Sequence, residues 1–97
     1  MTFYDIKSRI VPVLKRQGVI KAALFGSFSR NENKKNSDID LLVKLDKTKT
    51  LLDLVALKLE LEERLHKKVD ILTYNSINPL LKTDILKEQK VIYEKRA

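Results

Sequence analysis

Cysteine and tryptophan are absent from this sequence of 97 residues, and only two glycines and two prolines occur in it. Without cysteine the chain can form neither a disulfide framework nor a thiolate metal site, which fits a reducing compartment. No apolar run approaches the roughly 18 residues that a membrane span needs, and the charged N-terminal segment is unlike a signal peptide. We therefore expect a cytoplasmic protein without a membrane-spanning segment.

Positive charge is in excess, with 20 lysines and arginines against 13 acids and a formal net charge of +7. This excess favours anionic partners such as nucleic acid, nucleoside triphosphates or acidic proteins, without choosing among them. The lysines are scattered along the chain, and the three tyrosines and three phenylalanines do not alternate with them. Direct binding of nucleic acid is therefore not favoured.

The balance of 43% hydrophobic and 34% charged residues is typical of a globular protein. A chain of this length buries roughly 60 to 65% of the surface that its unfolded form exposes. We expect a single domain over residues 1–97, with room for one core and one site.

Three segments have the periodicity and the end signals of helices. The first follows Thr2 and stops before Gly18, and Pro12 should kink or divide it. The second follows Thr50, and the third begins at Pro79.

Four short apolar segments are typical of strands: residues 19–25, 38–45, 69–72 and 91–93. Their alternation with helices predicts an α/β or α+β domain in which helices pack on a four-stranded sheet. The polar stretch between the first two strands should begin with a short helix from Ser27 to about Asn33.

Two acids, Asp38 and Asp40, stand where the second strand should begin. Residues two apart on a strand point to the same face, about 6.5 to 7 Å apart at the backbone. At about 6 Å two carboxylates repel by roughly 2 to 3 kcal/mol at an effective dielectric constant near 20, so a cation or solvent must offset the cost. Oxygen ligands of this kind suit Mg²⁺ that arrives with a phosphorylated substrate. An ordinary capping or turn role for the acids is the alternative.

Gly26 and Ser27 stand at the junction of the first strand and the short helix. Unpaired amides and the positive end of a helix dipole can receive a phosphate at such a junction, and glycine allows a close approach. A tight turn with Ser27 as an ordinary helix cap is the alternative.

A third acid, Asp70, lies between Val69 and Ile71 in the third predicted strand. If that strand lies beside the strand of Asp38 and Asp40, three carboxylates converge. Three carboxylates can hold two divalent cations about 3.5 to 4 Å apart for in-line displacement at phosphorus. A surface acid on an edge strand is the alternative.

Gly26-Ser27, ten intervening residues, Asp38-Ile39-Asp40 and the later Asp70 together resemble the nucleotidyltransferase domain of the DNA polymerase beta superfamily. The flanking segments LFGSFSR and SDIDLLV are similar to those of the minimal nucleotidyltransferases, over essentially the full chain. The resemblance implies a nucleotidyltransferase fold with a small mixed sheet.

The resemblance also implies roles for individual residues. Asp38 and Asp40 would bind two Mg²⁺ ions, and Asp70 would complete the catalytic metal site and help to deprotonate the acceptor. Gly26 and Ser27 would hold the triphosphate of ATP. Arg30 would pair with phosphate or hold an acid of the site in place. Asn31 stands where the family commonly has glycine, which affects the shape of that loop.

Finally, the resemblance implies a partner. In this family the usual partner resembles a HEPN-domain ribonuclease toxin encoded next door, and the nucleotidyltransferase acts as the antitoxin by transferring AMP from ATP to a tyrosine of the toxin. Neutralisation by binding alone, with a vestigial nucleotide site, is the main alternative, and a small-molecule acceptor is another. A homo-oligomer, or a hetero-oligomer with the toxin, is compatible with the sequence.

Overall fold

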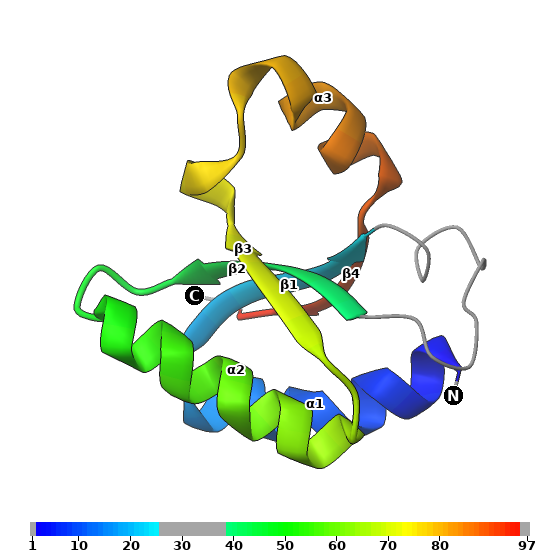
Figure 1. Cartoon of the computed structure of the whole chain (residues 1–97), viewed down its shortest axis with the longest axis vertical. Coiled ribbons are helices and arrows are strands. Elements are labelled where there is room, and N and C mark those ends of the chain that lie inside the picture. Colours follow the sequence, from blue (N-terminus) through cyan, green and yellow to red (C-terminus); the bar gives the residue numbers. More distant parts are fainter. Residues whose placement is uncertain (1, 26–38, 96–97) are drawn as a thin grey trace.

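The computed structural model describes residues 2–25 and 39–95 (Figure 1). Eight elements follow one another along the chain: α1 (Phe3–Arg16), β1 (Val19–Phe25), β2 (Ile39–Leu45), α2 (Leu51–Leu65), β3 (Val69–Thr73), the 3-10 turn η1 (Tyr74–Ser76), α3 (Pro79–Glu88) and β4 (Lys90–Glu94). The short helix expected from Ser27 to Asn33 falls outside the described residues.

The four strands form one mixed sheet in the order β3-β2-β1-β4. Strand β1 pairs antiparallel with β2 and with β4, whereas β2 and β3 are parallel. A parallel pair needs a crossover connection, and α2 provides it between β2 and β3. The expected mixed four-stranded sheet with helices packed on it is therefore confirmed.

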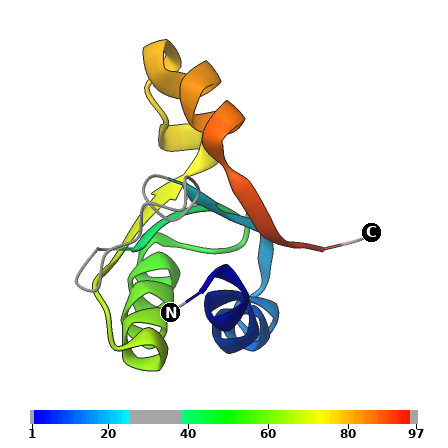
Figure 2. The same ribbon diagram turned by 90° about the vertical axis from the view of Figure 1, so that its right-hand side faces the viewer.

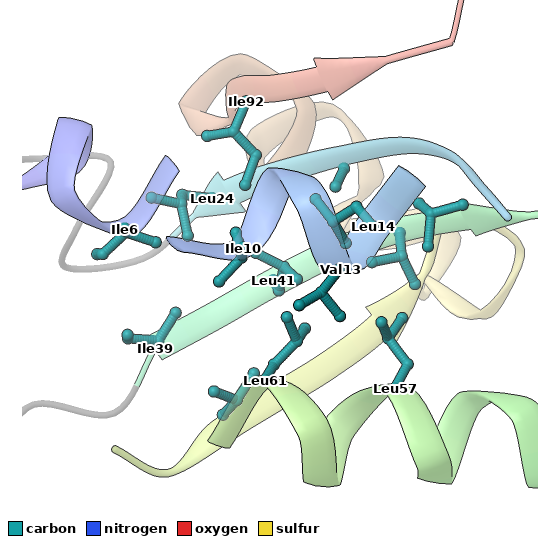
Figure 3. Close-up of a cluster of buried hydrophobic side chains, with 14 of the residues drawn as sticks. Ile6, Ile10, Val13, Leu14, Leu24, Ile39, Leu41, Leu57, Leu61 and Ile92 are labelled. Atoms are coloured by element: carbon teal, nitrogen blue, oxygen red, sulfur yellow. The ribbon is translucent and has the colours of Figure 1, made fainter. Parts of the chain in front are cut away.

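Helices α1 and α2 cover one face of the sheet, whereas η1 and α3 lie on the other side (Figures 1 and 2). The main core lies between the two helices and the sheet, and Figure 3 shows part of it. Fully burying an aliphatic side chain of this size stabilises the fold by roughly 1.5 to 3 kcal/mol. The core residues come from every layer: Ile6, Ile10, Val13, Leu14, Val19, Ala22, Leu24, Ile39, Leu41, Val43, Leu57, Leu61, Leu65, Val69 and Ile92.

Helix α1 runs through Pro12 without being divided. Proline at this position removes one backbone hydrogen bond of the helix. The buried stripe on either side of it, which includes Ile10 and Val13, keeps the helix packed on the sheet. The helix then ends before Gly18, whose φ of +76° is a conformation that glycine adopts without strain.

Reciprocal hydrogen bonds cap the first two helices at their N-termini. In α1 the Asp5 backbone N–H donates to the Thr2 hydroxyl, and the Thr2 backbone N–H donates to the Asp5 carboxylate. Thr50 and Asp53 repeat this arrangement in α2. The hydrogen bond from the threonine backbone holds the pKa of each aspartate below its ordinary value of 3.8.

The lowered pKa values predict how stability responds to acid. A carboxylate whose pKa is lowered by folding stabilises the protein above its ordinary pKa, and this contribution disappears as the pH falls through the folded-state value. We expect the urea midpoint of the wild type to fall between about pH 5 and pH 2, and that of Asp53→Asn to fall less. Asp84→Asn, which removes an exposed carboxylate outside the caps, is the control. Equal acid sensitivity of Asp53→Asn and the wild type would contradict the prediction.

Candidate functional site

The register of the parallel pair brings Asp40 and Asp70 together. Asp40 on β2 is the direct partner of Asp70 on β3, just as Ile39 is the partner of Val69. Neighbouring strands lie about 4.8 Å apart, so the two carboxylates project side by side from adjacent strands. The sequence made this convergence conditional on β3 lying beside β2, and that condition is confirmed.

Both acids belong to the face of the sheet that lies away from α1 and α2. Ile39 and Leu41, on either side of Asp40, are fully buried in the main core. Because side chains alternate along a strand, Asp40 must point to the opposite face. Val69 and Ile71 contact the same core on β3, so Asp70 points the same way as Asp40. Each acid is partly exposed.

A smaller apolar cluster lies beside the acids on this face. Its buried members are Ala23, Leu42 and Ile77, and the side chains packed against it are Phe25, Tyr74 and Ile85. Leu42 lies two residues along β2 from Asp40, and Phe25 on β1 is the direct partner of Asp40. The carboxylates therefore stand next to an apolar floor, which strengthens electrostatic interactions made there.

The other site residues expected from the sequence lie outside the described part of the chain: Gly26, Ser27, Arg30 and Asp38. Phe25 and Ile39, the residues that flank this segment, lie at the end of the sheet where Asp40 lies. The roles of these four residues in phosphate and metal binding stay predictions.

A family model described as Polymerase beta, Nucleotidyltransferase matches residues 8–97. The chain belongs to this nucleotidyltransferase family. Its paired acids, Asp40 and Asp70, thus lie in a chain whose family transfers nucleotidyl groups.

Relatives of known name are nucleotidyltransferases that act on proteins. A Methanocaldococcus jannaschii protein, provisionally named protein adenylyltransferase, is 58% identical over 88 residues, which make up 91% of this chain and 95% of the relative. The protein adenylyltransferase MntA of Thermococcus cleftensis is 34% identical over 79 residues, or 81% of this chain and 78% of the relative.

Solved structures support the same fold. One that is provisionally described as a minimal nucleotidyltransferase has a TM-score of 0.81 and 33% identity, and covers 93% of this chain and 95% of its own. A toxin–antitoxin pair with AMP-PNP has a TM-score of 0.78 at 24% identity, covering 93% and 74%. A tri-AMPylated HEPN toxin of Shewanella oneidensis in complex with MNT antitoxin gives 0.72 at 21%, covering 95% and 72%.

The donor chemistry of this nucleotidyltransferase site fits a hard divalent cation. Asp40 and Asp70 offer carboxylate oxygens from adjacent rigid strands, and Mg²⁺ usually takes one or two protein carboxylates and completes its shell with water and phosphate. Residues 2–25 and 39–95 contain no group of three or more potential metal ligands. The third acid expected from the sequence, Asp38, falls outside those ranges.

A groove of about 860 Å³ lies at the other end of the sheet, and neither acid lines it. Five lysines are among the residues that form it: Lys21, Lys44, Lys47, Lys49 and Lys82. The sequence signal for this groove is the segment KLDKTK at 44–49, whose lysines the overall charge count treats as scattered. Because the groove lies away from the paired acids, we assign it no part in nucleotidyl transfer.

Tyr74 braces the elements above the acids. Its hydroxyl donates to the Gln89 side chain at 2.6 Å, which ties η1 to the end of α3. The Lys21 ammonium lies 5.4 Å from the centre of the Tyr74 ring. Burial raises the pKa of Tyr74, so its hydroxyl stays protonated and keeps donating at neutral pH.

Membrane insertion was also considered. Within the ranges that the structure describes, none of the helices is both long and apolar enough to cross a bilayer.

Proposed function

We propose that this nucleotidyltransferase is a Mg²⁺-dependent protein adenylyltransferase that transfers AMP from ATP to a tyrosine of a HEPN-domain toxin and so acts as the antitoxin. The pairing of Asp40 with Asp70 supports this proposal most directly. The relatives named protein adenylyltransferase add support for a protein as the acceptor.

In the proposed reaction, the tyrosine oxygen attacks the α-phosphorus of ATP. A new oxygen–phosphorus bond forms, the bond from the α-phosphorus to the bridging oxygen breaks, and pyrophosphate leaves. Asp70 accepts the proton of the tyrosine hydroxyl, and Gly26 and Ser27 hold the triphosphate. When bound at Asp38, Asp40 and Asp70, two Mg²⁺ ions would supply positive charge to the reacting phosphates.

The HEPN-type partner is proposed from structural relatives. One is a toxin–antitoxin pair with AMP-PNP, and another is a tri-AMPylated HEPN toxin in complex with MNT antitoxin. The lack of cysteine supports the cytoplasm as the compartment, because a thiol-free chain needs no oxidising environment.

The test is to incubate the purified chain with ATP, Mg²⁺ and the HEPN-domain protein encoded beside it, and to measure the mass of that partner. We expect the partner to gain AMP, and fragment masses to place it on a tyrosine. Omission of Mg²⁺ should abolish the gain. A partner that is neutralised without any change in mass would instead favour neutralisation by binding alone.

A further inference from the structure

Helix α3 carries apolar side chains that the rest of the chain leaves exposed. None of its residues is buried. Leu80 is 87% exposed and Leu81 is 53% exposed, and we refer to these two as the α3 leucines. Exposed apolar groups that gather on one element mark interaction surfaces more often than isolated ones do.

The α3 leucines lie on the side of the sheet that carries the acids. Figure 2 shows α3 across the sheet from α1 and α2. The contact runs through Ile85 of α3, which packs against the cluster that contains Leu42. Leu42 shares its strand face with Asp40, two residues away, at a backbone distance of about 6.5 to 7 Å. Helix α3 is therefore a neighbour of the site.

An apolar stripe connects this contact to the outer end of the helix. Leu81 precedes Ile85 by four residues, so both lie on the same face of α3, one turn apart. Ile85 lies over the apolar floor next to Asp40, and Leu81 extends that surface outward into solvent. Leu72, which shares its strand face with Asp70, is a further partly exposed apolar side chain on this side of the sheet.

Both ends of α3 are fixed. At its N-terminus the Asn78 side chain caps the helix by accepting from the Leu80 backbone N–H at 2.9 Å, directly after buried Ile77. At its C-terminus Gln89 accepts from Tyr74, and β4 then pairs with β1. A helix that is held at both ends presents its side chains in one arrangement, which lowers the entropy cost of binding a partner.

We propose that the α3 leucines form the docking surface for the acceptor protein of the transfer reaction. This inference rests on the proposed function, because it identifies where the acceptor binds. The acceptor hydroxyl has to reach Asp70, and α3 lies on that side of the sheet. The complementary surface on the acceptor is an apolar patch close to its modified tyrosine.

The other exposed apolar stripe does not meet this requirement. Leu52 and Leu59 of α2 are 80% and 59% exposed, but α2 covers the face of the sheet opposite the acids (Figure 1). An acceptor that docked there would be separated from Asp70 by the thickness of the sheet and the core. A second copy of this chain on the α3 leucines would itself lie on the acid side and compete with the acceptor for that face.

The two stripes provide a matched experiment. We compare Leu80→Ser/Leu81→Ser with the control Leu52→Ser/Leu59→Ser, measuring the Kd for the HEPN-domain protein by calorimetry, the KM for that acceptor and the Kd for ATP. We expect the α3 pair to raise the acceptor Kd and KM by about 10- to 100-fold with the ATP Kd unchanged. The α2 pair should leave all three within about twofold. Circular dichroism checks folding, and Leu80→Glu is the substitute if the α3 pair unfolds.

The outcomes separate the docking surface from the proposed function. If the wild type transfers AMP and the α3 pair leaves the acceptor Kd and KM unchanged, or if both pairs weaken binding equally, the docking surface is wrong and the function stands. If the wild type transfers no AMP, the function fails, and the calorimetric Kd alone decides the docking surface. Light scattering that shows the wild type dimerising through the α3 leucines, with acceptor binding unaffected by their loss, would also overturn the inference.

Discussion

Replacing Asp40 by asparagine is expected to lower AMP transfer to the partner on the order of 10³-fold, equivalent to about 4 kcal/mol of transition-state stabilisation. The amide has nearly the shape of the carboxylate but lacks its negative charge. It therefore cannot hold a divalent cation beside Asp70 in the same way. The measurement is the initial rate of incorporation of labelled AMP into the HEPN-domain protein.

The same substitution should leave the fold intact. Asp40 lies on the face of β2 away from the main core, and its side chain is partly exposed. The change removes one of two like charges that project from directly paired positions on β2 and β3. We expect the free energy of unfolding to change by less than about 1 kcal/mol, which separates loss of chemistry from loss of structure.

Glu63→Gln is the control for the change in charge. It removes one negative charge from the exposed surface of α2, on the opposite side of the sheet. Transfer at the wild-type rate is expected for this variant. If Asp40→Asn retains transfer within about tenfold of the wild type, Asp40 is not a ligand of the catalytic centre. If the variant transfers no AMP yet still neutralises the partner, binding alone accounts for neutralisation.

Much of the fold could be predicted because local signals agree with the final packing. The strand predicted at 19–25 is confirmed as β1, since a continuous apolar segment after Gly18 suits a strand that is buried in the middle of the sheet. The helix after Thr50 is confirmed as α2, where the capping box and the apolar stripe indicate the same start and the same buried face. The strand predicted at 69–72 extends one residue further, to Thr73.

Contacts between distant segments were harder to predict. The alternation of side chains along β2 predicts that Asp40 faces away from Ile39, but not which strand lies next to it. The partnership of Asp40 with Asp70 depends on the right register of β3 after the α2 crossover, a long-range property of the sheet. The exposure of Leu80 was equally hidden, because periodicity shows that a helix has an apolar face without showing what covers it.

Replacing Leu61 by alanine is expected to lower the free energy of unfolding by about 2 to 5 kcal/mol, measured by urea denaturation. Leu61 is fully buried against residues of α1 and the sheet (Figure 3). Leu59→Ala is the matched control, because Leu59 belongs to the same helix and is 59% exposed. Two residues along a helix rotate a side chain by about 200°, so one leucine faces the core and the other faces solvent.

The comparison also tests how the core supports the site. Ile39 and Leu41 of β2 belong to the same buried cluster as Leu61, and Asp40 lies between them on the opposite face of the strand. A cavity at Leu61 removes packing from beneath the strands that hold Asp40 and Asp70 in register. We therefore expect Leu61→Ala to lose AMP transfer at a lower temperature than Leu59→Ala does, in parallel with unfolding. Equal destabilisation by the two variants would mean that α2 does not bury the face assigned to it.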